Sequence, residues 1–528
     1  MREFCTAGPV KADIHYTLPP LERLDRDAIV RMIDSQKYFV LHAPRQTGKT
    51  SALLALVKDL NATGRYRALY VNVEGGQALR NDVGGAMQTI LSVISEGARR
   101  HLNDSFPNSI AVETLALGGP GDALRRMLNH WCEHSPLPIC LMIDEIDALV
   151  GDTLISVLRQ LRGGYFDRPK GFPQSVILCG VRDVRDYRIH SGGGEIITGG
   201  SAFNIKVESL RLGDFSQSDV RRLYEQHTAE TGQLFDEAVY PLVWDLTRGQ
   251  PWLVNALAYE ACFRFEEDRS KPITTDLILR AKEHLIVNRV THIDQLTDKL
   301  KEPRVQRVIE PIVRGDDGDT FALAGSDDAQ YLIDLGLIRS GPRGLEISNG
   351  IYLEVIPREL NYQMQLAFMS REDSAWYIAS DGRLDIPKML GAFQQFFREN
   401  SEIWLERFEY KEAGPQLILQ AYLQRIVNGG GRIDREYGLG RRRTDLLIQW
   451  THPAGTQRVV IELKMLRGTA EKTVGEGLRQ IADYMDKTGT NDAHLLIFDR
   501  RPGVSWDEKI FRRDERTADG RPVTLWGM

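Results

Sequence analysis

Residues 38–60 read YFVLHAPRQTGKTSALLALVKDL, and this stretch decides the fold of the front of the chain. An apolar strand-like segment leads into a loop, and the loop leads into an amphipathic helical segment. The spacing Ala43-x4-Gly48-Lys49-Thr50 is that of a P-loop, in which backbone N–H groups at a helix start bind phosphate oxygens. We expect Lys49 to reach the outer phosphates and Thr50 to bind Mg²⁺. The residues predicted to hold the nucleotide are Pro44, Arg45, Gln46, Thr47, Gly48, Lys49, Thr50 and Ser51.

Further strands support this interpretation. PICLMIDEIDAL (138–149) is an apolar strand that ends in Asp144 and Glu145, and SVILCGVRDVRDYR (175–188) is another, with Arg182 just past its end. We expect Asp144 to hold Mg²⁺, Glu145 to act as general base on the attacking water, and Arg182 to sense the γ-phosphate. Strands at about 38–42, 67–73, 139–143 and 175–180, with helices between them, predict a parallel α/β sheet.

Five segments in this order resemble AAA+-like and STAND-type ATPases: APRQTGKTS, LMIDEID, LCGVRDVRDY, SAFNIKVESLRLGDFS and TRGQPWLVNALA. The resemblance covers about residues 15–295 and implies ATP binding and hydrolysis, often within an oligomer. It also implies that Gly249 and Pro251 lie near the nucleotide. An arginine that contacts the nucleotide in cis or in trans is common in such proteins, and the candidates are Arg182, Arg185 and Arg188.

The middle of the chain is expected to be mostly helical. Residues 216–290 fit a helical lid over the nucleotide. In the next part, DDAQYLIDLGLIR (327–339) is helical in pattern and GLEISNGIYLEVI (344–356) has the pattern of a short hairpin, which together suggest a winged-helix module. Such a module either contacts DNA or only packs against the lid. Residues 361–400 fit a helical connector.

A second group of charged residues lies in RRRTDLLIQWTHPAGTQRVVIELKM, residues 441–465. A hairpin folded about Pro453–Ala454 would place Asp445 opposite Glu462, and strand alternation puts Glu462 and Lys464 on one face. Two carboxylates this close repel unless a cation lies between them, and oxygen ligands suit Mg²⁺. The alternative is an ordinary hairpin with a surface ion pair. The run Arg441, Arg442 and Arg443 can contact a nucleic-acid backbone without reading its sequence.

The order helix (412–431), hairpin, helix (476–489), strand (493–499) resembles the PD-(D/E)xK nuclease superfamily, across about residues 401–510. The resemblance implies that Asp445 and Glu462 bind metal and that Lys464 positions water. It assigns accessory roles to Gln480 and Tyr484, and Glu412 could be the acidic residue of the first helix. The chain has RTD where the family has Pro-Asp.

Composition limits the alternatives. The 528 residues are 42% hydrophobic and 27% charged, with a net charge of −6, so nucleic-acid contact must come from local patches rather than bulk charge. No apolar run approaches the length of a membrane span. Five cysteines without metal-like spacing suggest reduced core thiols. We expect these domains: 1–205, P-loop ATPase core; 206–295, helical lid; 296–372, winged-helix-like module; 373–400, helical connector; 401–528, nuclease-like domain.

The sequence thus predicts an α/β protein: a P-loop NTPase core with helical lid, a winged-helix-like module and a C-terminal restriction-endonuclease-like domain. The function expected is an ATPase-regulated, Mg²⁺-dependent nuclease, plausible in defence against foreign DNA. The alternatives are an ATP-switched DNA-binding or regulatory protein whose nuclease-like fold does not cleave, and a STAND-like sensor that holds its nucleotide. We expect ATP and Mg²⁺ as cofactors, nucleic acid (DNA rather than RNA) as partner, ATP-dependent homo-oligomers, no membrane, and a cytoplasmic location, with an accessory protein or trigger left open.

Overall fold

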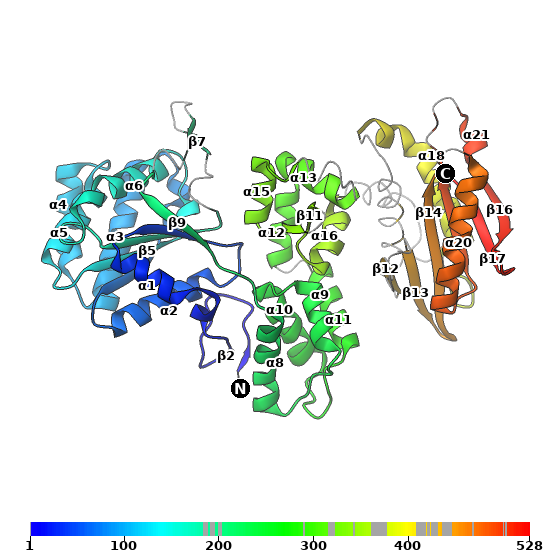
Figure 1. Ribbon diagram of the computed structural model, residues 1–528, viewed down its shortest axis with the longest axis horizontal. Helices are drawn as coiled ribbons and strands as arrows, with labels where there is room; N and C mark the ends of the chain where they lie inside the picture. The colour runs from blue at the N-terminus through cyan, green and yellow to red at the C-terminus, as the bar shows by residue number, and fades with distance from the viewer. Residues whose placement is uncertain are drawn as a thin grey trace. The chain divides into compact units, whose positions relative to one another are not determined.

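The computed structural model describes residues 2–182, 188–190, 196–198, 203–288, 291–314, 323–341, 344–360, 377–407, 419, 423, 431–435, 446–466, 469–499, 501 and 504–528. The chain divides into two compact units (Figure 1). The first consists of Met1–Val308 and Gly318–Leu353, and the second of Ile309–Asp317 and Glu354–Met528. No helix in these described ranges is long and apolar enough to cross a membrane.

The first unit is built on a parallel five-stranded sheet with the order β4-β5-β6-β3-β9. Its strands are β3 (Tyr38–His42), β4 (Arg67–Asn72), β5 (Ile139–Asp144), β6 (Ser175–Gly180) and β9 (Lys206–Arg211). The first four agree with the predicted strands, and their apolar runs are typical of strands buried on both faces. The edge strand β9 was not predicted, because its sequence KVESLR has no continuous apolar run and is not followed directly by a recognisable motif.

Helices cover both faces of this sheet (Figure 1). One face packs against α1 (Arg26–Asp34) and α2 (Lys49–Ala62), through apolar residues such as Ile33 and Leu53. The other face packs against α3 (Val83–Leu102), α5 (Ala123–His134) and α6 (Gly151–Gly163). These two layers hold the C-terminal ends of β3, β5 and β6 side by side, which is where ligands bind in open α/β sheets.

The predicted lid region is helical: α8 (Gln217–Thr231), α9 (Val239–Thr247), α10 (Pro251–Tyr259), a π-helical turn (Glu260–Phe265) and α11 (Thr275–Val287). Ser216 and Asp219 form a capping box that starts α8. An N-terminal segment (residues 2–18) lies against these helices. Its short strands β1 (Glu3–Phe4) and β2 (His15–Tyr16) pair in parallel, and Phe4 packs against Tyr16 and Tyr224.

The part that follows contains α12 (Thr291–Leu300), α13 (Pro303–Arg314), α15 (Asp327–Asp334), β10 (Ile338–Gly341), β11 (Gly344–Ile347) and α16 (Gly350–Leu360). The prediction of a hairpin across 344–356 was wrong: β11 pairs with the preceding β10, and residues from Gly350 onward are helical. The reason is the Asn349 side chain, which accepts a hydrogen bond from Tyr352 N at 2.9 Å and so starts a helix. The winged-helix assignment and the predicted domain boundaries stay predictions.

The second unit contains a six-stranded sheet with the order β12-β13-β14-β15-β17-β16. Its strands are β12 (Gly431–Arg435), β13 (Leu446–His452), β14 (Gly455–Met465), β15 (Ala493–Phe498), β16 (Phe511–Arg516) and β17 (Pro522–Gly527). The predicted hairpin is confirmed: β13 and β14 pair antiparallel around the loop Pro453–Ala454. β14 then pairs with β15 in parallel, through the crossover helix α20 (Ala470–Thr488).

Opposite faces of this sheet pack against different helices. Ile461 belongs to the cluster formed with α18 (Ile386–Arg407), whereas Val460 belongs to the cluster formed with α20. Since side chains alternate along a strand, Glu462 and Lys464 point to the α20 side with Val460. Most of the predicted helix 412–431 lies outside the described residues.

Candidate functional site

The P-loop has the form that its sequence predicts. Gly48 precedes α2 with φ at 90°, in the left-handed region that favours glycine. Lys49 is buried, and its Nζ donates hydrogen bonds to Ala43 O and Pro44 O, both at 3.0 Å. Thr47 is fully buried and donates from its hydroxyl to Pro44 O at 2.8 Å. The lysine amine therefore lies inside the loop, with carbonyl partners that a phosphate would replace.

Two side chains with oxygen atoms suited to bind a metal ion, Thr50 at the start of α2 and Asp144 at the end of β5, lie together. Thr50 Oγ1 donates to Asp144 Oδ2 at 2.7 Å, and the Asp144 side chain is fully buried. Tyr70 on β4 also donates to Asp144 Oδ2, at 3.0 Å. A hydroxyl and a carboxylate suit Mg²⁺, whose other ligands would be water and phosphate oxygens. In the described part of the chain no three His, Cys, Asp or Glu residues cluster as a complete metal site.

Glu145 follows Asp144 in a left-handed backbone conformation, with φ at 57°. Burial raises the pKa of its carboxyl; the neighbouring Asp147 raises it further, and the Lys49 charge opposes both. Asp147 in turn accepts a hydrogen bond from Val181 N at 3.3 Å, which ties the end of β5 to the end of β6. A half-buried carboxylate with a raised pKa beside a phosphate loop has the properties of a general base.

Arg182 follows β6 and faces helix α15. Its Nε lies 3.6 Å from Asp334 Oδ2, and its guanidinium lies 4.9 Å from the centre of the Tyr331 ring. The nearby Gly336 backbone approaches the P-loop, since a Cβ there would lie 2.7 Å from Pro44 Cγ. Arg185 lies outside the described residues, and only the backbone of Arg188 is described. The structure thus places Arg182 at the sheet edge where the P-loop, Asp144 and Glu145 meet.

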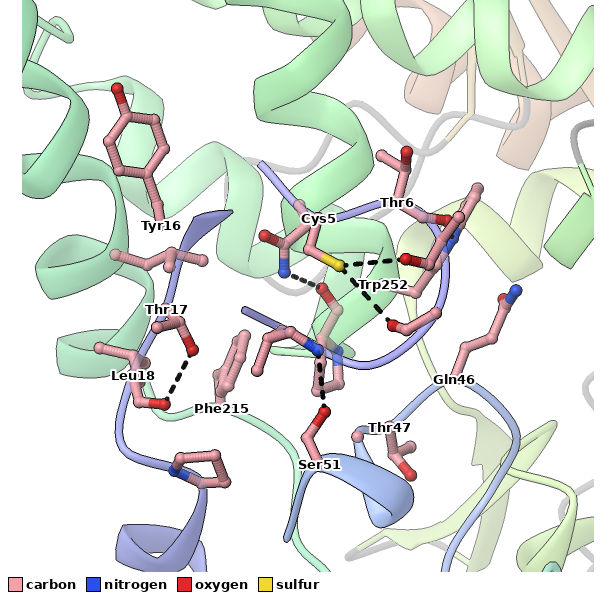
Figure 2. Close-up of a pocket in the computed structure, with 18 of the residues that line it drawn as sticks. Cys5, Thr6, Tyr16, Thr17, Leu18, Gln46, Thr47, Ser51, Phe215 and Trp252 are labelled. Carbon is pink, nitrogen blue, oxygen red and sulfur yellow. Dashed lines mark hydrogen bonds between the residues drawn. The ribbon is translucent and has the colours of Figure 1, made fainter. Parts of the chain in front are cut away.

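A cavity of about 120 Å³ opens beside the P-loop. Figure 2 shows Tyr16, Thr17 and Leu18 of the N-terminal segment on one side and Gln46 and Thr47 of the P-loop on the other. The helical region after β9 contributes part of the lining, including Pro251, whose predicted contact with the nucleotide stays a prediction. Gly249 itself packs on the lid junction: its O accepts from Phe215 N at 2.8 Å, and a Cβ there would lie 1.9 Å from Phe215 O.

Arg23 connects two parts of the cavity wall by hydrogen bonds. Its guanidinium donates to Thr47 O at 2.7 Å and to Gly213 O at 2.8 Å, and so links the P-loop to the lid junction. Burial lowers its pKa to about 10, which leaves it charged at neutral pH. Ser51 Oγ accepts from Val10 N at 3.1 Å, which fastens the N-terminal segment to α2.

The P-loop also contacts α12. His292 Nδ1 lies 2.5 Å from Gln46 Oε1 and its Nε2 lies 2.5 Å from Tyr352 OH, while the ring stacks on Trp252. Burial lowers the pKa of His292 to about 4, so the ring is neutral. His292, Arg23 and Tyr70 were not predicted from the sequence. Only Tyr70 had a usable signal, because it lies near the end of a strand expected beside the one that ends in Asp144.

Comparison with known proteins agrees with this geometry. Residues 31–187 match the family model described as AAA domain. These residues form an AAA-type ATPase domain. Across its length the chain has no match among curated proteins.

Several solved structures are similar to this chain over most of their own length. They include the Walker-type ATPase PABY2304 of Pyrococcus abyssi (13% identity, 67% of this chain and 99% of that chain, TM-score 0.45). Cdc6p from Pyrobaculum aerophilum is similar at 14% identity, over 67% of this chain and 99% of that chain, with a TM-score of 0.37. The RuvB Holliday junction branch migration motor of Thermotoga maritima is similar at 13% identity, over 64% and 98%, with a TM-score of 0.35.

Four of the residues predicted for the C-terminal site lie among the described residues of the second unit. Glu462 on β14 is 1% exposed, and its Oε1 accepts from Lys464 Nζ at 2.7 Å. Gln480 and Tyr484 lie on α20, and Tyr484 is buried in the cluster between α20 and the sheet. Buried Gln480 Oε1 has no hydrogen-bond partner among the described residues. Asp445, the run Arg441–Arg443 and Glu412 lie outside the described residues.

These residues fit a divalent cation in two respects. Glu462 is a carboxylate buried from water, and the unpartnered amide oxygen of Gln480 lies on the helix that covers the same face of the sheet. A buried polar atom without a partner is uncommon, and an ion, a water or a ligand would satisfy it. Glu462 would hold the ion, and the second carboxylate predicted by the sequence is Asp445, one position before β13.

Proposed function

We propose that this protein is an ATP-regulated, metal-dependent nuclease. The observation that carries the proposal is the β13–β14 hairpin, in which buried Glu462 pairs with the partly exposed Lys464 on the face covered by α20. Leu446 pairs with Ile461. If this pairing continues for one residue, Asp445 lies opposite Glu462, as a two-carboxylate metal site requires. The topology of meander, crossover helix and parallel strand supports the resemblance to PD-(D/E)xK nucleases.

In this proposal the first unit hydrolyses ATP. Lys49 and the P-loop bind the phosphates, Thr50 and Asp144 would hold Mg²⁺, and Glu145 takes the proton of the attacking water. Arg182 contacts the γ-phosphate once it leaves Asp334. An arginine supplied by a neighbouring copy would make the assembly an ATP-dependent homo-oligomer, of the AAA+ or STAND kind.

The second unit hydrolyses a phosphodiester bond, of DNA rather than RNA. Asp445 and Glu462 would hold Mg²⁺, which supplies charge stabilisation at the scissile phosphate and a more acidic water. Lys464 orients that water, while Gln480 and Tyr484 position the groups around it. Arg441, Arg442 and Arg443 contact the backbone. Defence against foreign DNA is a role that such a pairing of activities would suit.

A second candidate rests on the same 2.7 Å contact between Lys464 and Glu462. An internal ion pair satisfies both charges without any metal. The protein would then be an ATP-switched DNA-binding or regulatory protein whose nuclease-like fold does not cleave.

One experiment separates the two candidates. The purified full chain is incubated with supercoiled plasmid DNA and with single-stranded RNA, with and without ATP and MgCl₂, and ATP turnover is measured in the same tubes. Glu462→Gln is compared with Glu471→Gln, an exposed carboxylate on α20. We expect Glu462→Gln alone to stop cleavage while both variants hydrolyse ATP normally.

Cleavage by Glu462→Gln at the wild-type rate contradicts the nuclease assignment. ATP turnover without cleavage by the wild-type protein favours the second candidate. For the ATPase, Lys49→Ala is compared with Lys58→Ala, whose lysine is exposed on the same helix. Loss of nucleotide binding in the first variant only is the expected result.

A further inference from the structure

We infer that Asn255 selects the base of the bound nucleotide, by accepting a hydrogen bond from the exocyclic amino group of adenine. The inference rests on the proposed nucleotide site and concerns the cavity beside it. It assigns a specificity role to a residue of α10 that contacts neither the P-loop lysine nor the metal ligands.

The cavity lies where a base would lie if the phosphates occupy the P-loop. Gln46, Thr47, Gly48 and Ser51 form the wall on the phosphate side. The remaining wall comes from the N-terminal segment and the lid, and is largely apolar, with Leu18, Phe215 and Trp252 among its residues. An apolar slot with a few polar groups, beside a phosphate loop, suits an aromatic base.

The Asn255 side chain lines this cavity and is 7% exposed. Its Nδ2 donates to Pro251 O at 2.8 Å, one helical turn earlier. A carbonyl oxygen can only accept, so the NH₂ end must face Pro251, and this contact fixes the orientation of the amide. Oδ1 is left buried and without a hydrogen-bond partner among the described residues. Asn255, a residue of the cavity lining, thus has a fixed acceptor without a partner among the described residues.

Three neighbouring polar groups have hydrogen-bond partners elsewhere. Trp252 Nε1 donates to Thr6 O at 2.8 Å, and Ser51 Oγ accepts from Val10 N at 3.1 Å. The Cys5 thiol donates to Ala7 O at 3.4 Å. None of these contacts satisfies Asn255 Oδ1, so a donor from the ligand is what this site lacks.

Base chemistry then decides between the purines. Adenine presents an amino group, a donor, at the position where guanine presents a carbonyl oxygen, an acceptor. Against Asn255 Oδ1 the guanine oxygen would leave two buried acceptors facing each other, and an unpaired buried acceptor is unfavourable. The site therefore takes ATP in preference to GTP.

The test measures binding to the full chain by competition with a fluorescent ATP analogue, in excess EDTA so that no turnover occurs. The competitors are ATP, GTP and purine riboside triphosphate, which is ATP without the amino group. We expect the wild-type protein to prefer ATP over each of the other two by about 10- to 100-fold. Asn255→Leu removes the acceptor at similar size, and we expect it to lose most of this preference by weakening ATP.

The matched control is Asn129→Leu, because Asn129 Oδ1 is also buried, with no partner in the described part of the chain, but lies on α5, outside the cavity lining. This variant is expected to keep the wild-type preference. Equal binding of ATP and purine riboside triphosphate by the wild-type protein overturns the inference even if Asn255→Leu fails to fold, and so does an unchanged preference in Asn255→Leu. Failure of the wild-type protein to bind any nucleotide overturns the ATP site itself, and the inference with it.

Discussion

The nucleotide site of the first unit and the Glu462 site of the second differ in how their parts are supplied. In the first unit, one continuous loop contains most of the residues proposed to bind phosphate, and Asp144 lies one hydrogen bond from Thr50. In the second, the proposed site residues lie on the strand β14 and the helix α20, with Asp445 one position before β13. A contiguous motif fixes its own geometry, whereas a dispersed one depends on strand register. The nucleotide site therefore follows from one segment of the sequence, whereas the Glu462 site depends on how separate segments pair.

The largest expected effect is at Glu145. Glu145→Gln removes the proposed general base but keeps the metal ligands, so we expect ATP turnover to fall by about 10²- to 10⁴-fold with ATP binding retained. Steady-state phosphate release and equilibrium binding measure the two properties. Glu74→Gln, an exposed carboxylate beyond β4, is the control. Normal turnover in Glu145→Gln would remove the base assignment and leave only a nucleotide-holding domain.

Lys464→Ala sharpens the comparison from the other unit. Loss of the amine should slow cleavage by about 10- to 100-fold, because a positioned charge near the reacting phosphate is lost. ATP turnover in the absence of nucleic acid should not change. Plasmid nicking and ATP hydrolysis are measured on the same preparation, with Lys472→Ala on the exposed side of α20 as the control. Unchanged nicking together with reduced stability would identify a purely structural ion pair.

Acid should affect the first unit through His292. Its pKa is about 4 when folded, below the ordinary value of about 6.5. The unfolded state therefore binds the proton more tightly, so this contribution to stability is complete above about pH 6.5 and is lost as pH falls toward 4. The loss reaches about 3 kcal/mol. Hydrogen exchange of P-loop and α12 peptides at pH 7.5 and 5 measures it.

His292→Gln cannot titrate in this range and should remove most of that pH dependence, while exposed His130→Gln should not. Equal acid sensitivity in both variants would show that other groups govern the first unit. Peptides from the second unit serve as the internal reference.

The smallest effect is expected at Tyr70. Tyr70→Phe removes one hydrogen bond to Asp144, worth about 1 kcal/mol, so the Mg²⁺ concentration for half-maximal ATP turnover should rise about 3- to 10-fold. A magnesium titration of turnover measures this change. Tyr66→Phe, whose hydroxyl contacts Asp34 instead, is the control and should leave the titration unchanged.

Local sequence patterns predicted much of this molecule. The P-loop, the strand that ends in Asp144 and the β13–β14 hairpin each follow from a run of neighbouring residues, and each agrees with the structure. The edge strand β9 and the switch from hairpin to helix at Asn349 were missed, because partner strands and capping decide them.

Contacts between distant residues could not be predicted from one sequence. Gln46 and His292 are 246 positions apart, and Trp252 and Thr6 are also 246 apart. No pattern in either segment identifies its partner, since packing brings them together. The same limit applies to Asn255, which is unremarkable in the sequence as a polar residue in an apolar helix.

Cys5 lies in the lining of the cavity beside the P-loop, so occupancy of this cavity can be followed by chemical labelling of the Cys5 thiol. All five cysteines are buried and unpaired, and Cys5 is the one that lines the cavity. Burial raises the pKa of its thiol, so the reactive thiolate is scarce at neutral pH and alkylation should be slow until the pH rises. A nucleotide in the cavity would slow it further. Protection of Cys5 from a small alkylating reagent, read by mass spectrometry, would therefore report occupancy without any engineered probe.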